Sequence, residues 1–263
     1  MITAGCDVGS LTSKAVILKD GRILKTAIIK SRPKPADSAV EVMNQALSQA
    51  GLSMGDISSC VGTGYGRDRI PFVSDTATEI ACHGRGAHWL VPSARTVIDI
   101  GGQDCKAIRL DAGGGMLKFT ANDKCASGTG RFLEVMARLL GIELSEIGGM
   151  SAESKSPITL ASACTVWAQA DVIQHLNNRV PVADIAAGIN NAMAARMAII
   201  VNGIGCERDV VMTGGVAKNA GVVAALEKML GLRIKRISRS DPQLAGAIGA
   251  ALIAVDREKG GAA

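Results

Sequence analysis

Short apolar runs alternate with longer amphipathic segments along the chain of 263 residues. The short runs are rich in Val, Ile and Ala and end at Gly, Asp or Pro, so they predict β-strands. They cover residues 2–8, 14–19, 22–29, 57–61, 117–121, 209–212 and 232–237. The longer segments place apolar residues three or four positions apart, which predicts helices. They cover residues 36–50, 76–90, 132–140, 165–177, 182–201, 220–230 and 242–255. This alternation is typical of an α/β protein.

A strand–turn–strand segment occurs twice in the chain. Residues 7–18 (DVGSLTSKAVIL) and residues 99–110 (DIGGQDCKAIRL) begin 92 positions apart, and their Asp, Gly, Lys, Ala and Leu coincide. Two strands that run into glycine turns can agree by chance in a chain with 31 glycines. The matched Asp and Lys argue against chance, because tight turns do not require either residue. We therefore predict a duplicated α/β domain.

The composition excludes several classes of protein. The chain is 48% hydrophobic with a mean hydropathy of +0.25, which excludes a disordered protein. No apolar run reaches the roughly 18 residues of a membrane span. Only 2% of the residues are aromatic and the net charge is a mild +5, so no stacking platform for single-stranded nucleic acid is predicted. We expect a cytoplasmic protein that binds neither nucleic acid nor a membrane.

The two repeated turns suit phosphate and magnesium. A strand that runs into a Gly/Ser/Thr turn brings backbone N–H groups close to an anion. The first turn adds hydroxyl donors and a positive charge from Ser10, Thr12, Ser13 and Lys14. We expect Asp7 and Asp99 to face one another across a cleft and to hold Mg²⁺. A third loop, 213–219, lies between a predicted strand and a predicted helix and can pass close under a nucleotide. Ordinary tight turns are the alternative, and the chain contains no P-loop motif.

Two of the seven cysteines stand out by position. Cys125 and Cys164 are 39 residues apart, and each lies just before a predicted helix. A helix N-terminus lowers the pKa of a thiol and stabilises negative charge, so two such thiolates suit an iron–sulfur cluster. Two cysteines are too few for a Cys₄ cluster, which a dimer would complete. Spacing alone also allows two incidental cysteines. Cys6, Cys60 and Cys206 lie in or beside apolar stretches and are expected to be buried. The three histidines, at positions 83, 88 and 175, are too scattered for a zinc site.

Nearly the whole chain resembles one protein family. The most specific segments are Gly62-Thr-Gly-Tyr-Gly-Arg67, Asp99-Ile-Gly-Gly-Gln-Asp104, Asn122-Asp-Lys-Cys125, Cys164-Thr-Val166 and Thr213-Gly-Gly-Val-Ala-Lys-Asn219. They are similar to the ATP-dependent activators of 2-hydroxyacyl-CoA dehydratases, a family that includes the ATPase subunits of benzoyl-CoA reductase. The resemblance implies an actin/hexokinase-like duplicated ATPase fold with a nucleotide cleft between two subdomains. We expect these to cover 1–92 plus 240–263, and 93–239 with the two cysteines.

The resemblance also implies cofactors and site residues. It places a [4Fe-4S] cluster, shared by two identical or homologous subunits, on Cys125 and Cys164. It implies ATP or ADP with Mg²⁺, and Asp7, Asp99 and Asp104 as the acidic groups that hold magnesium and position water. The nucleotide loops then comprise Gly9, Ser10, Leu11, Thr12, Ser13 and Lys14, then Gly101, Gly102 and Gln103, and finally Gly214, Gly215, Lys218 and Asn219.

The activity implied by the resemblance is ATP-driven electron transfer. A ferredoxin or flavodoxin would reduce the cluster, and the electron would pass to a dehydratase. Two departures from the family pattern, Gln169 and Cys105, favour a benzoyl-CoA (aromatic acyl-CoA) reductase subunit as the alternative. A small-molecule kinase of the same fold, or a regulatory or filament-forming ATPase, would make no use of the two cysteines.

Overall fold

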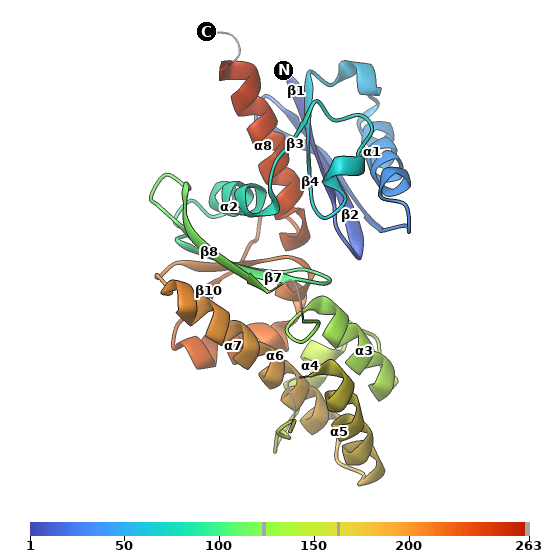
Figure 1. Ribbon diagram of the computed structural model, residues 1–263, viewed down its shortest axis with the longest axis vertical. Coiled ribbons are helices and arrows are strands. Elements are labelled where there is room, and N and C mark those ends of the chain that lie inside the picture. Colours follow the sequence, from blue (N-terminus) through green and yellow to red (C-terminus); the bar gives the residue numbers. More distant parts are fainter. Residues whose placement is uncertain (123–124, 162–163, 261–263) are drawn as a thin grey trace.

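The computed structural model describes residues 1–122, 125–161 and 164–260, and it contains two five-stranded sheets (Figure 1). In the first sheet the order is β3 (Arg22–Lys30), β2 (Thr12–Lys19), β1 (Ile2–Val8), β4 (Ser59–Thr63) and β5 (Asp75–Thr76). In the second it is β8 (Met116–Asn122), β7 (Cys105–Leu110), β6 (Thr96–Ile100), β9 (Val210–Thr213) and β10 (Ile234–Lys235).

The two sheets have the same topology. In the first, β1 is antiparallel to β2 and parallel to β4. In the second, β6 is antiparallel to β7 and parallel to β9. The register is also repeated, because Asp7 lies opposite Lys14 and Asp99 lies opposite Lys106. The duplication predicted from the sequence is therefore confirmed.

Helices cover both sheets (Figure 1). They are α1 (Pro35–Ala50), α2 (Glu79–Leu90), α3 (Gly130–Leu140), α4 (Ile147–Ser151), α5 (Thr165–Asn177), α6 (Val182–Ile204), α7 (Ala220–Leu230) and α8 (Ala245–Gly260). Helix α1 packs on β1–β3, whereas α6 and α7 belong to the core of the second sheet. Helix α8 packs on β1, β2 and β4 of the first sheet. Helix α2 packs on α8 and also contacts β6, β7 and β9 of the second sheet, so it lies between the two sheets, each of which forms one half of the molecule with its helices. In the part of the chain that the structure describes, no helix is both long enough and apolar enough to cross a membrane.

Some boundaries differ from the sequence prediction. The helix expected over 76–90 begins only at Glu79, because Thr78 caps it and Thr76 pairs with β4. The strand expected over 232–237 shrinks to β10. Helix α4 was not predicted, since five residues with two glycines carry no clear period. The last helix begins with a 3₁₀ turn, Pro242–Leu244, and runs on to Gly260.

Glycines bring α2 and α8 into backbone contact. A Cβ added at Gly249 would lie 1.8 Å from the carbonyl oxygen of Cys82, and one at Gly86 would lie 2.0 Å from that of Ala245. Neither obstacle is a flexible side chain, so the helices would have to separate to admit a methyl group. This contact fixes α2 firmly to the first half of the molecule.

We expect Gly249→Ala to lower the free energy of unfolding by about 3 kcal/mol, because overpacking against a rigid backbone forces the helices apart. Denaturant unfolding monitored by circular dichroism measures this. Gly203→Ala is the matched control, since Gly203 also lies in a helix but has no atom within 4 Å of an added Cβ. That change should raise the free energy of unfolding by about 0.5–1 kcal/mol. Equal stability of Gly249→Ala and the wild type would contradict the close packing.

Candidate functional site

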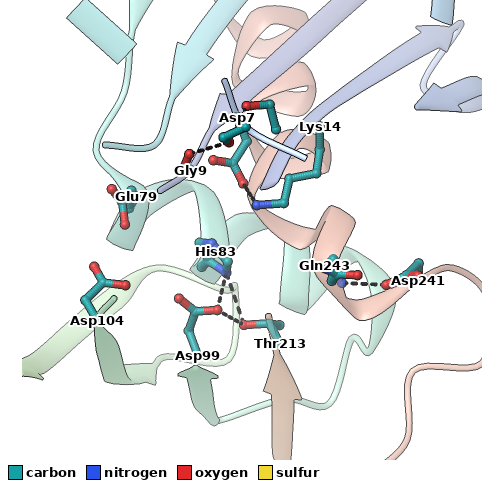
Figure 2. Close-up of polar contacts among 12 residues, drawn as sticks. Asp7, Gly9, Lys14, Glu79, His83, Asp99, Asp104, Thr213, Asp241 and Gln243 are labelled. Atoms are coloured by element: carbon teal, nitrogen blue, oxygen red, sulfur yellow. Dashed lines mark hydrogen bonds and ion pairs between the residues drawn. The ribbon is translucent and has the colours of Figure 1, made fainter. Parts of the chain in front are cut away.

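Two buried carboxylates occupy equivalent places in the two sheets. Asp7 lies near the end of β1 and Asp99 near the end of β6, and they are 4% and 2% exposed. Lys14 Nζ lies 3.2 Å from Asp7 Oδ2, and Lys106 Nζ lies 3.7 Å from Asp99 Oδ2. Figure 2 shows the carboxylates on opposite sides of a central histidine, His83. The repeat thus brings together two acid–lysine pairs, one from each half.

The first loop, 9–14, begins with a tight turn that is closed by hydrogen bonds at Gly9. The Gly9 N–H donates to the Thr12 carbonyl at 3.1 Å, and the Ser31 hydroxyl donates to the Gly9 carbonyl at 2.7 Å. A Cβ at Gly9 would lie 2.8 Å from the Thr12 oxygen and 3.2 Å from Lys14 Nζ. The loop therefore presents backbone next to a lysine, an arrangement that suits a phosphate.

The second loop, 101–104, touches the first. A Cβ at Gly102 would lie 2.5 Å from Leu11 Cγ, so the two loops meet across the halves. Within the second loop, the Gly101 N–H donates to the Asp104 carbonyl at 2.9 Å. The side chain of Asp104 is 30% exposed, and its Oδ2 accepts a hydrogen bond from Lys106 Nζ at 2.5 Å. Asp104 therefore lies beside the buried acid pair but is not part of it.

Charge balance at the second loop depends on Lys106. Its Nζ also lies 2.7 Å from Glu79 Oε2. Burial alone would lower the pKa of Lys106, but Asp99, Glu79 and Asp104 together raise it well above its usual value. Burial would raise the pKa of Asp99, yet His83, Lys106 and the hydroxyl of Thr213 hold it below its usual value. The ammonium and the Asp99 carboxylate are therefore both charged at neutral pH.

The third loop, 213–219, starts beside Asp99. Gly214 has φ +81, and a Cβ there would lie 2.3 Å from the Ile100 carbonyl oxygen. A 3₁₀ turn, Gly215–Lys218, follows, and the Asn219 side chain caps α7 by accepting from two backbone N–H groups. Lys218 Nζ donates to Asp241 Oδ2 at 2.6 Å.

A pocket opens beside this third loop. Its lining includes Lys218, Ala220, Ile234, Arg236 and Pro242. The third loop thus supplies one wall of this pocket, through Ala217 and Lys218.

One site residue was missed by the sequence interpretation. His83, on α2, is 7% exposed, and its Nδ1 lies 3.1 Å from Asp99 Oδ1 and 3.1 Å from Thr213 Oγ1 (Figure 2). Glu79 lies one helical turn earlier on the same helix and pairs with Lys106. The sequence signal was available, because a Glu and a His four positions apart share one face of a helix.

The two singled-out cysteines lie on the second half. Cys125 is half-buried, and its Sγ lies 3.0 Å from Ser127 Oγ. The side-chain and backbone hydrogen bonds from Ser127 lower the pKa of the Cys125 thiol. Cys164 is exposed and is the N-cap residue of α5, as predicted. Cys125 precedes Thr129, the N-cap of α3, by four residues, so its predicted place at a helix N-terminus is only approximate. Residues 123–124 and 162–163 lie outside the described part of the chain.

The remaining cysteines are unlike these two. The buried ones are Cys6, Cys60, Cys82 and Cys105. Burial raises the pKa of Cys60 and Cys82 to about 12 and that of Cys105 to about 11. The prediction that Cys206 is buried was wrong: it is half-buried, because it follows the end of α6. Four thiols are therefore packed inside the fold.

Backbone hydrogen bonds join the second loop to the cysteine segment. The Gly130 N–H donates to the Gly101 carbonyl at 2.8 Å, and the Arg131 N–H donates to the Gly102 carbonyl at 2.9 Å. These two N–H groups belong to the first two residues of α3, the helix that follows Cys125. Helix α3 in turn packs against α5, which begins after Cys164. The loop predicted to bind phosphate is thus in direct contact with the element next to Cys125.

Known proteins share this architecture over its full length. The activator of lactoyl-CoA dehydratase from Anaerotignum propionicum is 46% identical over 256 residues, which cover 97% of this chain and 98% of that protein. The structure of the 2-hydroxyisocaproyl-CoA dehydratase activator from Clostridium difficile, with bound ADPNP, superposes with a TM-score of 0.95 at 42% identity and covers 100% of this chain and 97% of that one. A ROK hexokinase from Thermus thermophilus superposes with a TM-score of 0.54 at 14% identity, covering 98% and 100% of the two chains. The predicted actin/hexokinase-like fold is therefore confirmed. The model of the BadF/BadG/BcrA/BcrD ATPase family matches residues 4–254, and the chain belongs to this ATPase family.

Proposed function

We propose that the protein is the ATP-dependent activator of a 2-hydroxyacyl-CoA dehydratase and donates single electrons to it from a [4Fe-4S] cluster. The names of its relatives support the dehydratase as the partner. The observation that carries the proposal is the pair of hydrogen bonds from Gly130 and Arg131 to Gly101 and Gly102. They connect the nucleotide loop to the helix beside Cys125, so a change at the bound nucleotide is transmitted to that cysteine.

The thiols fit an iron–sulfur cluster. The pKa of the Cys125 thiol is lowered, and Cys164 is exposed at the N-cap of α5, where its sulfur can reach a ligand. When bound, the cluster supplies one-electron chemistry. Two thiolates are half of a Cys₄ set, and we assign the other two to a second copy of the chain or a homologous subunit. Val166 and Trp167, each 68% exposed on α5, give that second subunit an apolar surface beside Cys164.

The three loops fit a nucleotide. We assign the phosphates of ATP to the loops 9–14 and 101–103, where Lys14 and Lys106 add positive charge, and the adenosine to the loop 214–219. Asp7 and Asp99 are ionisable oxygen donors of the kind that hold Mg²⁺. The ion would neutralise phosphate charge, and the residues themselves orient the phosphates and the attacking water. Asp104 holds Lys106 in place.

The two halves then move relative to each other when a nucleotide binds. We place their boundaries near residues 92 and 239, with the last segment returning to the first half. Nucleotide binding between them favours one relative orientation, which the partner dehydratase recognises. We assign the reduction of the cluster to ferredoxin or flavodoxin in the cytoplasm.

Anaerobic purification with iron and sulfide analysis tests the proposal. We expect about four iron atoms for every two chains, together with ATP-dependent activation of a purified 2-hydroxyacyl-CoA dehydratase. A colourless protein that phosphorylates a small metabolite would contradict it. Stable co-purification with an aromatic acyl-CoA reductase component would instead favour a reductase subunit, because an activator associates with its partner only transiently.

A further inference from the structure

His83 occupies the centre of the acid pair without a role in the proposed function. It comes from α2, whereas its two polar partners come from the ends of β6 and β9 (Figure 2). Its ring is 7% exposed, and Nδ1 lies 3.1 Å from both Asp99 Oδ1 and Thr213 Oγ1. The Thr213 hydroxyl closes the triangle by donating to Asp99 Oδ1 at 3.0 Å.

This triangle indicates which ring nitrogen carries a hydrogen. The Thr213 hydroxyl has one hydrogen and gives it to Asp99, so it offers only lone pairs to the ring. The Asp99 carboxylate also offers only lone pairs. A hydrogen on Nδ1 is therefore the arrangement that suits both neighbours, since it can be donated to Thr213 and faces the Asp99 carboxylate. The other nitrogen, Nε2, lies on the side of Asp7: both Nε2 and Asp7 Oδ2 lie 2.9 Å from the position of a Cβ on Gly246.

The helix that carries His83 is itself fixed at two places. Backbone contacts at Gly86 and Gly249 hold α2 against α8. One turn before His83, Glu79 pairs with Lys106, whose ammonium also faces Asp99. The position of Asp99 is thus set by two side chains on one face of a helix that belongs to the opposite half of the molecule.

We propose that His83 is a positioning residue for ATP hydrolysis, holding Asp99 and Thr213 through its Nδ1–H in the arrangement that the reaction needs. A carboxylate that must act in a defined direction gains from a second donor that fixes its rotamer. His83 does so from the first half, so Asp99 is correctly placed only while the two halves are together. The inference rests on the ATPase activity of the family and not on the cluster.

Three substitutions at position 83 test it in the full-length protein. His83→Ala removes the donor. His83→Asn puts an amide N–H near the place of Nδ1, whereas His83→Gln puts its amide near that of Nε2. We measure phosphate release at saturating Mg-ATP, the KM for ATP, the dissociation constant of ADP by calorimetry, and thermal unfolding. His88→Asn is the control, because His88 lies on the same helix away from the acid pair.

The expected result separates kcat from binding. His83→Ala should lower kcat by about 10–100-fold, with the KM for ATP and the affinity for ADP changed by less than about threefold. His83→Asn should restore most of kcat and His83→Gln should not, while His88→Asn keeps the wild-type rate. Thr213→Val should lower kcat similarly, and combining it with His83→Ala should cost little more, since both break the same contact.

Other results would overturn the role. One is a kcat of His83→Ala within about twofold of the wild type. Another is rescue by Gln instead of Asn, and a third is additive loss in the double variant. If His83→Ala unfolds, the comparison of His83→Asn with His83→Gln decides, because only the first keeps a donor near the place of Nδ1. A wild-type protein that released no phosphate would overturn both this role and the proposed function.

Discussion

Cys164→Ser is expected to leave the protein without bound iron, while it still folds and hydrolyses ATP. Cys164 is exposed at the N-cap of α5, and serine fits the same place, so the change removes only the soft sulfur ligand. A cluster shared by two copies would lose two of its four thiolates at once. Iron analysis after anaerobic reconstitution should fall from about four atoms per two chains to below about one, and ATP-dependent activation of the dehydratase should be lost. Cys125→Ser should give the same result.

Cys206→Ser provides the matched control for this experiment. Cys206 is a half-buried thiol, like Cys125, but it follows the end of α6, where its sulfur lies 3.9 Å from the Glu207 carbonyl oxygen. Its replacement should leave the iron content and the activation unchanged. Iron bound at the wild-type level by Cys164→Ser would show that the cluster assignment is incorrect.

Asp99→Asn is expected to lower the rate of ATP hydrolysis by about 100-fold or more. Asparagine has the shape of aspartate but lacks the charge that faces Lys106 and His83. Its amide oxygen can still accept from Thr213, but its NH₂ group then takes the place of Oδ2, which faces the Lys106 ammonium, so the site loses an anion and an acceptor. Steady-state phosphate release at saturating Mg-ATP measures the effect, and the iron content should stay at the wild-type level.

Asp104→Asn serves as the comparison for that substitution. Its side chain is 30% exposed, and it contacts Lys106, which keeps Glu79 as a second partner. We expect a loss of less than about tenfold, as for a partly exposed charge whose partner stays paired. Equal losses for Asp99→Asn and Asp104→Asn would refute the assignment of the buried acid to the reaction.

Much of the site follows from the sequence because it is built from local pairs. Asp7 and Lys14, like Asp99 and Lys106, are cross-strand neighbours of a hairpin, and such pairs are fixed by a few residues of turn. The repeated spacing therefore predicted the strands and the turns, whereas the cross-strand facing of acid and lysine is a finding of the structure. The hydrophobic period likewise predicted α5 and α7 with the bounds that the structure has.

The rest depends on contacts between distant parts of the chain. His83 meets Thr213, 130 positions away, only because α2 packs against α8 and reaches the second sheet. No local pattern encodes that meeting. The prediction that Cys206 is buried was wrong for a related reason. Its neighbours in the sequence are apolar, but the end of α6 does not lie inside the core. Cys125 lies four residues before the N-cap of α3, where its carbonyl accepts from the Asn122 amide and its sulfur lies beside the Ser127 hydroxyl.

The missing side chain at Gly102 has a kinetic consequence. Leu11 of one half rests where a Cβ would be, and the carbonyl of the same glycine accepts from Arg131 at the start of α3. Separation of the two halves and movement of α3 therefore both displace Gly102. We expect the two motions to occur together. A conformational probe on the first half and one beside Cys125 would report one common relaxation rate after ATP is added.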